Sequence, residues 1–70
     1  MRYAIVIEKA ATNYAAYVPD LPGCVATGMT RDETETLIRD AIAFHIEGLQ
    51  ADGQPIPPSH SQVEYIEVSV

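Results

Sequence analysis

The chain has little positive charge, a single cysteine and no long apolar run. Its 70 residues include four lysines and arginines against ten aspartates and glutamates, which gives a net charge of −6. Such a surface repels phosphate backbones, so we expect no direct nucleic-acid binding by this chain alone. The same charge attracts a basic protein partner and accelerates the encounter with it. The lone Cys24 excludes an internal disulfide and a thiolate metal cluster, and it fits a cytoplasmic location.

Several other features are missing. No apolar stretch approaches the ~20 residues that span a membrane. The N-terminus lacks the layout of a signal peptide, because Arg2 is followed by only five apolar residues before Glu8. The GxxxxGK loop, the GxGxxG turn and the GxSxG elbow are absent as well. We therefore expect a chain without a membrane segment and without a nucleotide or hydrolase motif.

Prolines and glycines cluster in one informative stretch, residues 18–28 (VPDLPGCVATG). Pro19 and Pro22 fix φ and remove backbone donors, so strand pairing stops there. Residues 21–24 (LPGC) fit a type II turn, with proline at the second position and Gly23 supplying a positive φ at the third. The stretch predicts a strand, a rigid bend and a second strand that Gly28 ends.

A single long helix is predicted from Thr30 to about Ala51. Thr30 and Glu33 have the spacing of a capping box, and Gly53 is placed as a left-handed C-cap. The pattern is amphipathic. Its expected apolar arc consists of Leu37, Ile38, Ala41, Ile42, Phe44 and Leu49.

The remaining elements follow from alternation and from breakers. A Pro-rich, polyproline-like connection at Gln54–Ser61 follows the helix. The predicted strands are Tyr3–Lys9, Tyr14–Val18, Cys24–Thr27 and Val63–Val70. The first strand is apolar on both faces, which favours a central position. Cys24–Thr27 is short, as edge strands often are.

These elements predict an α+β fold with the order β-β-β-α-β, one mixed sheet and a single helix packed on one of its faces. Residues 1–70 form one domain. One helix covers one face of the sheet, and the other face still carries apolar residues from the set Ala4, Val6, Ala15 and Tyr17 or their opposites. Covering such a face with a partner recovers several kcal/mol at ~25 cal/mol per Å². We therefore expect a homo-oligomer, a dimer or tetramer, or a complex with another protein.

Candidate catalytic groups have structural explanations. His45 lies on the apolar arc without a second ligand at i±3 or i±4, and His60 lies in the connection without a positioned acid. Cys24 begins a strand without an activating base. The helix acids are explained by the helix dipole and by solubility, so no metal site, cofactor or catalytic residue is expected. Asp20, between two prolines, either stabilises its own turn or contacts a partner.

Two segments together resemble a known family. Residues 14–28, with the PDLPGC bend, are followed by Thr30, a helix with Ala41, Ile42, His45 and Leu49, and the segment 52–59 (DGQPIPPS). This combination is similar to the N-terminal domain of HicB-type antitoxins over nearly the whole chain. The sequence departs from the family pattern at Met29 and at residues 34–36, both at the helix entry.

The resemblance implies a partial RNase H-like fold that has generally lost its catalytic acids, with the last strand parallel to a central first strand. It implies a non-enzymatic module that neutralises a HicA-type toxin, a small basic mRNA-cleaving protein, by occlusion. Many full-length members carry a C-terminal DNA-binding domain, and the chain ends in its last predicted strand, so none is expected here. The partner-binding residues that we expect are Asp20, Leu21, Pro22 and Gly23.

Two other hypotheses stay open. One is an orphan homo-oligomeric interaction domain with another protein partner, which the absence of a neighbouring toxin-like gene favours. The other is a degenerate RNase H-like nuclease, which predicts magnesium binding and RNA cleavage by the pure protein.

Overall fold

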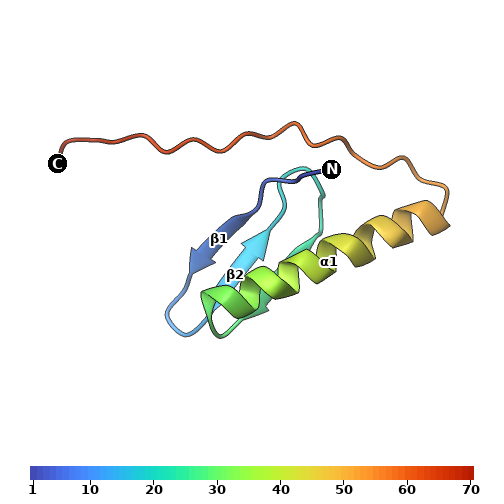
Figure 1. The fold of residues 1–70 in the computed structure, drawn as a ribbon. Helices are drawn as coiled ribbons and strands as arrows, with labels where there is room; N and C mark the ends of the chain where they lie inside the picture. Colours follow the sequence, from blue (N-terminus) through green and yellow to red (C-terminus); the bar gives the residue numbers. More distant parts are fainter.

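The computed structural model describes residues 1–70 as three strands followed by one helix (Figure 1). The strands are β1 (Val6–Lys9), β2 (Tyr14–Tyr17) and β3 (Val25–Gly28), and the helix is α1 (Arg31–Ala51). The helix lies across one face of the sheet. The predicted α+β class and the order of three strands before a helix are confirmed.

The sheet is antiparallel, in the order β1-β2-β3. Val6 pairs with Tyr17, and Tyr17 pairs with Val25 on its other side. The central strand is therefore β2, and the prediction of a central first strand is wrong for this sheet. The apolar side chains on both faces of β1 have another cause: one face packs under α1 and the other belongs to the uncovered side.

The helix begins as predicted. Thr30 is the N-cap, and its Oγ1 accepts a hydrogen bond from the backbone N–H of Glu33 at 3.0 Å. The return half of the capping box differs, because the Glu33 carboxylate accepts from the backbone N–H of Met29 at 3.0 Å rather than from Thr30. The helix ends as predicted at Ala51, and Gly53 after it has the left-handed φ of 65° expected of the cap.

The core lies between α1 and the sheet. Alternate residues of each strand point to this side, and Thr34 and Ile38, one helical turn apart, meet them. The apolar cluster consists of Ala16, Val18, Leu21, Cys24 and Ile38, with Tyr3, Ile5, Ile7, Ala26, Ala41 and Ile42 packed around it. The core is small because the helix covers one side of three short strands.

Three residues of the predicted apolar arc lie outside this core, and one of them, Leu49, is half-buried. Phe44 is 78% exposed and Leu37 is 40% exposed. The predicted arc was wider than the strip of helix that the narrow sheet can cover, so its outer members face solvent. No helix of the chain combines the length and the apolarity that crossing a membrane requires.

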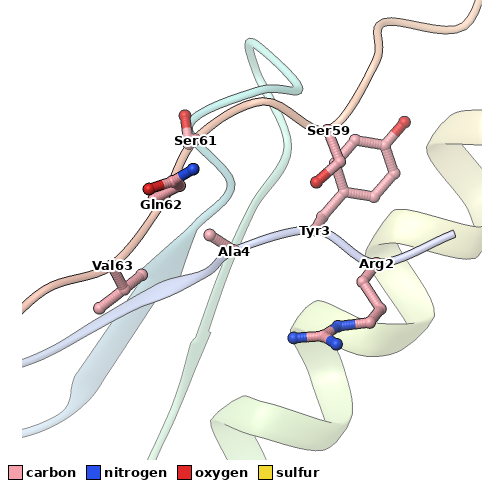
Figure 2. A pocket seen from close by; sticks show the side chains of 7 residues that line it. All are labelled: Arg2, Tyr3, Ala4, Ser59, Ser61, Gln62 and Val63. Atoms are coloured by element: carbon pink, nitrogen blue, oxygen red, sulfur yellow. The ribbon is translucent and has the colours of Figure 1, made fainter.

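The predicted last strand at Val63–Val70 is not formed, and the predicted mixed sheet is correspondingly purely antiparallel. These eight residues, called the arm below, run extended and exposed along the outside of the molecule (Figure 1). A hollow of about 660 Å³ lies between residues 2–4 and residues 59–63, where the connection meets the arm (Figure 2). The arm makes no ladder with β1. Residues 3–5, predicted as the start of the first strand, also lie outside the ladder.

Candidate protein-binding surface

The bend at residues 18–24 is a closed unit of backbone hydrogen bonds. The N–H of Cys24 donates to the carbonyl of Leu21 at 3.1 Å, and the N–H of Leu21 donates to the carbonyl of Val18 at 3.1 Å. The N–H of Val18 donates to the carbonyl of Cys24 at 3.2 Å, which joins the two ends of the bend. With a φ of 83° at Gly23, this geometry fits the type II turn that the sequence predicts.

The four residues expected to contact a partner divide into two pairs. Leu21 is fully buried in the core, and Asp20 is 5% exposed. Pro22 and Gly23 are exposed at the tip of the bend. Only the tip presents a surface to a partner, while Asp20 and Leu21 fix its position from below.

Asp20 holds the C-terminal end of the Pro-rich connection by a set of hydrogen bonds that we call the clasp. Its Oδ2 accepts hydrogen bonds from the backbone N–H groups of His60 at 3.0 Å and Ser61 at 2.9 Å. Its Oδ1 accepts from the Ser61 hydroxyl at 2.7 Å. These bonds, above all that from the Ser61 N–H, hold the pKa of Asp20 below its usual value. The clasp ties residues forty apart in sequence, a long-range partnership with no local signal.

The acid that sequence reasoning did not find for His60 is the same Asp20. The His60 ring Nδ1 lies 3.2 Å from Asp20 Oδ1, and also 3.2 Å from the carbonyl oxygen of Pro58. The Ser61 hydroxyl bonds to Asp20 rather than to the ring. The three groups therefore form an anchor, and they lack the nucleophile-to-base contact of a catalytic triad.

The face of the sheet away from α1 carries a row of apolar side chains, Val6, Tyr17 and Val25, which we call the open row. The strand register puts the three directly beside one another, one from each strand. Tyr17 is 42% exposed and Val25 is 64% exposed. The open row ends at the bend, because Tyr17 and Val25 are the last sheet pair before Val18 and Cys24.

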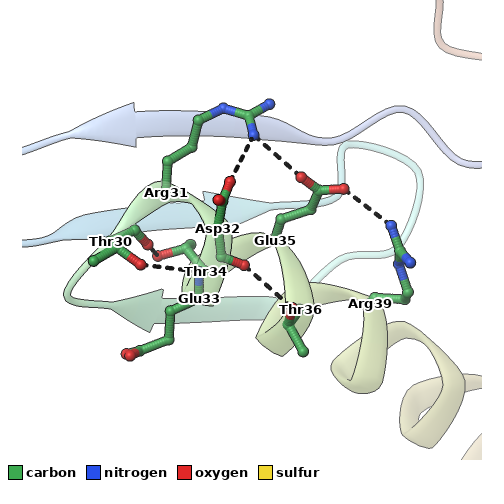
Figure 3. Close-up of polar contacts among 8 residues, drawn as sticks. All are labelled: Thr30, Arg31, Asp32, Glu33, Thr34, Glu35, Thr36 and Arg39. Atoms are coloured by element: carbon green, nitrogen blue, oxygen red, sulfur yellow. Dashed lines mark hydrogen bonds and ion pairs between the residues drawn. The ribbon is translucent and has the colours of Figure 1, made fainter.

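Most charged side chains on the first turns of α1 form ion pairs with one another (Figure 3). Glu35 accepts from Arg31 at 3.1 Å and from Arg39 at 2.9 Å, each four residues away. Arg31 also lies 3.6 Å from Asp32. Two of the chain's four basic residues are thus paired with acids on their own helix, which leaves the surface dominated by negative charge.

No group of three or more histidine, cysteine, aspartate or glutamate side chains converges in a way that holds a metal ion. His45 is half-buried on α1. Cys24 is buried in the core, and the loss of hydration raises the pKa of its thiol, opposite to what a nucleophile requires.

Comparison with known proteins gives a consistent picture. The family model of the HicB-like antitoxins of bacterial toxin–antitoxin systems matches residues 3–69. An uncharacterized 14.9 kDa protein from the rep–hol intergenic region of Haemophilus phage HP1 is 42% identical over 66 residues, which cover 94% of this chain and 50% of that protein. Antitoxin HicB 2 of Photorhabdus laumondii is 32% identical over 69 residues, 97% of this chain and 50% of its own length. The chain thus spans half the length of these two relatives.

A solved structure is similar as well. A chain of the HicA3 and HicB3 toxin–antitoxin complex superposes with a TM-score of 0.73 at 35% sequence identity. The match covers 84% of this chain and 70% of that chain. The likeness therefore extends to most of the fold described above.

Proposed function

The chain belongs to the HicB-like antitoxins of bacterial toxin–antitoxin systems, and on this premise we propose that it neutralises a HicA-type toxin by binding and occluding it. It acts as a protein-binding module in the cytoplasm and transforms no substrate. The observation that carries the proposal is the likeness, at a TM-score of 0.73, to a chain of a complex between HicA3 and HicB3. A fold shared at 35% identity supports a shared mode of partner recognition.

We assign the toxin contact to the open row and the adjoining tip of the bend. The row exposes a tyrosine and two valines side by side, and Pro22 and Gly23 are exposed in the bend that follows the last strand pair. Aromatic and branched side chains at the centre of a polar surface are the usual anchors of protein interfaces. Asp20 and Leu21 contribute by holding the tip in place from inside.

Electrostatics supports a basic partner. The net charge of −6, with Arg31 and Arg39 already paired to Glu35, gives a surface that attracts a basic toxin and repels RNA. On this proposal the antitoxin competes with the toxin's substrate for a positively charged surface and itself makes no contact with nucleic acid. The chain also self-associates in this proposal.

The test is a binding titration with a co-encoded HicA-type toxin, with toxin-dependent mRNA cleavage as the second readout. Tyr17→Asp and Val25→Asp each bury a charge in the contact and should weaken binding by about tenfold or more. Phe44→Asp is the matched control, because Phe44 is an equally apolar, exposed residue on α1 rather than on the sheet. Affinity should also fall as salt rises.

The assignment to the open row would be refuted if all three variants lost the same affinity for the toxin, or if none of them lost affinity. Cleavage that persists in the presence of a saturating, folded antitoxin would refute the proposed function. RNA cleavage by the pure antitoxin in magnesium would favour the nuclease alternative instead.

A further inference from the structure

We propose that the partner toxin lays one arginine over Ala15 on the open face of the sheet, with its guanidinium on the carboxylate of Glu8 and against the ring of Tyr17. This inference deepens the proposed function and rests on it. It names the chemical group that the surface beside the open row selects.

A second row of side chains lies beside the open row on the same face of the sheet. Glu8 pairs with Ala15, and Ala15 pairs with Thr27, so the register sets these three next to one another, one from each strand. We call them the polar row. Each member lies two residues along its strand from a member of the open row, and side chains two residues apart share a face. The polar row therefore continues the open row toward the turn between β1 and β2.

Ala15 is the small residue at the centre of this surface. It is half-buried, while Glu8 and Thr27 on its two sides are exposed. Neighbouring strands lie about 4.8 Å apart, so the Cα atoms of Glu8 and Thr27 are about 10 Å apart, with only a methyl group between them. Tyr17 is the diagonal neighbour of Glu8 across two paired strands, at a spacing that long side chains bridge. A long side chain from a partner can lie over Ala15 and meet all three of its neighbours.

The polar groups around Ala15 have no partners within the chain. Glu8 takes part in none of the ion pairs. The Glu8 carboxylate and the hydroxyls of Thr27 and Tyr17 are also absent from the side-chain hydrogen bonds. Glu8 is the only acidic residue of the three strands. The open face thus carries one uncompensated negative charge, directly beside its apolar row.

A guanidinium matches this set of groups. It carries five N–H donors in one plane, so two can bind the carboxylate of Glu8 while others reach a hydroxyl. It also stacks on aromatic rings, and the side chain of Tyr17 is 42% exposed. A lysine ammonium is a strongly hydrated point charge without the planar fork. The net charge of −6 attracts a basic protein in general, and Glu8 fixes where one of its charges docks.

A double-mutant cycle with the co-encoded HicA-type toxin tests the contact. Glu8→Gln removes the charge and keeps the shape of the side chain, and each arginine of the toxin is replaced in turn by lysine. We expect Glu8→Gln to weaken binding by about tenfold or more, as close charge pairs at interfaces do. One toxin arginine should be coupled to Glu8, so that its replacement weakens binding to the unmodified chain and has little further effect on the Glu8→Gln variant.

Two controls separate a local contact from the effect of net charge. Glu47→Gln makes the same change at an exposed residue of α1, and screening by salt should limit its effect to about twofold or less. Glu8→Lys should abolish binding to the unmodified toxin, and exchanging the coupled arginine for glutamate should restore it in part. Glu8 is exposed, so both Glu8 variants should melt at the temperature of the unmodified chain.

The inference is overturned if Glu8→Gln and Glu47→Gln have equal affinities for the toxin, or if no toxin arginine is coupled to Glu8. If Tyr17→Asp still weakens binding in that case, the proposed function stands without this contact. A chain that does not bind the toxin at all overturns both.

Discussion

Replacing Gly28 by alanine tests how closely α1 is seated on the sheet. A Cβ at this position would lie 2.6 Å from Thr34 Oγ1 and 3.1 Å from the backbone nitrogen of Thr34, well inside contact distance. Thr34 cannot turn aside easily, because it is fully buried and its hydroxyl donates to the carbonyl of Thr30 at 2.7 Å. The added methyl group therefore pushes the first turn of α1 away from β3.

The size of the effect follows from overpacking, which costs about 1–3 kcal/mol in a packed interior. A chain of 70 residues has about 3.5–10 kcal/mol of stability in total at ~0.05–0.15 kcal/mol per residue, so the loss is a large fraction. In a small domain each kcal/mol shifts Tm by about 4–8 °C. We expect Gly28→Ala to lower the free energy of unfolding by about 1–3 kcal/mol and Tm by about 4–24 °C.

Gly48→Ala is the matched control. It makes the same chemical change on α1, where nothing lies within 4 Å of the new Cβ, so it should raise stability by about 1 kcal/mol through helix propensity. Urea denaturation followed by circular dichroism, at one fixed protein concentration, measures both variants. Opposite signs are predicted, and a Gly28→Ala protein as stable as the unmodified chain would refute the close seating of α1.

Three further predictions concern the bend and its clasp. Leu21→Ala should lower the free energy of unfolding by about 2–5 kcal/mol, because the Leu21 side chain is fully buried. Val25→Ala on the exposed face should change the free energy of unfolding by about 0.5 kcal/mol or less, and equal effects of the two substitutions would contradict the burial of Leu21. In the folded chain the pKa of Asp20 lies below its ordinary value of 3.8, so the clasp is fully formed above pH 3.8 and is lost as the pH falls through the lower folded pKa. The amide resonance of Ser61 should shift with this acid transition, and the same resonance should show no such transition in the Asp20→Asn variant. The buried Cys24 thiol, with its raised pKa, should react with iodoacetamide at neutral pH far more slowly than in urea; equal rates argue against the burial.

Local signals in the sequence were reliable guides to the fold. Pro22 and Gly23 predicted the type II turn, and Thr30 and Gly53 predicted the helix ends, because each of these residues acts through its own backbone geometry or side-chain reach. Alternation also placed Val6 and Tyr17 on one face, although the sequence left open which face is uncovered. The register settles that in favour of the side away from α1.

Long-range partnerships were not predictable. Asp20 was expected to bond within its own turn or to contact a partner. Its bonds to Ser61 were not expected, because the path of the Pro-rich connection decides which donors arrive. Phe44 was expected in the core, but the width of the sheet decides how much of an apolar arc is covered. The arm has the pattern of a strand, and pattern alone does not say which edge receives it.

The central claim is that the open row and the bend tip bind a toxin while the chain performs no chemistry itself. Hydrogen exchange of the antitoxin, measured free and in complex with its HicA-type toxin, tests this most directly. The account predicts new protection at the tip of the bend and at the surface of β2 and β3 around Tyr17 and Val25, with the outer face of α1 around Phe44 unchanged. Protection confined to that helix face, with the sheet and the bend unaffected, would contradict it.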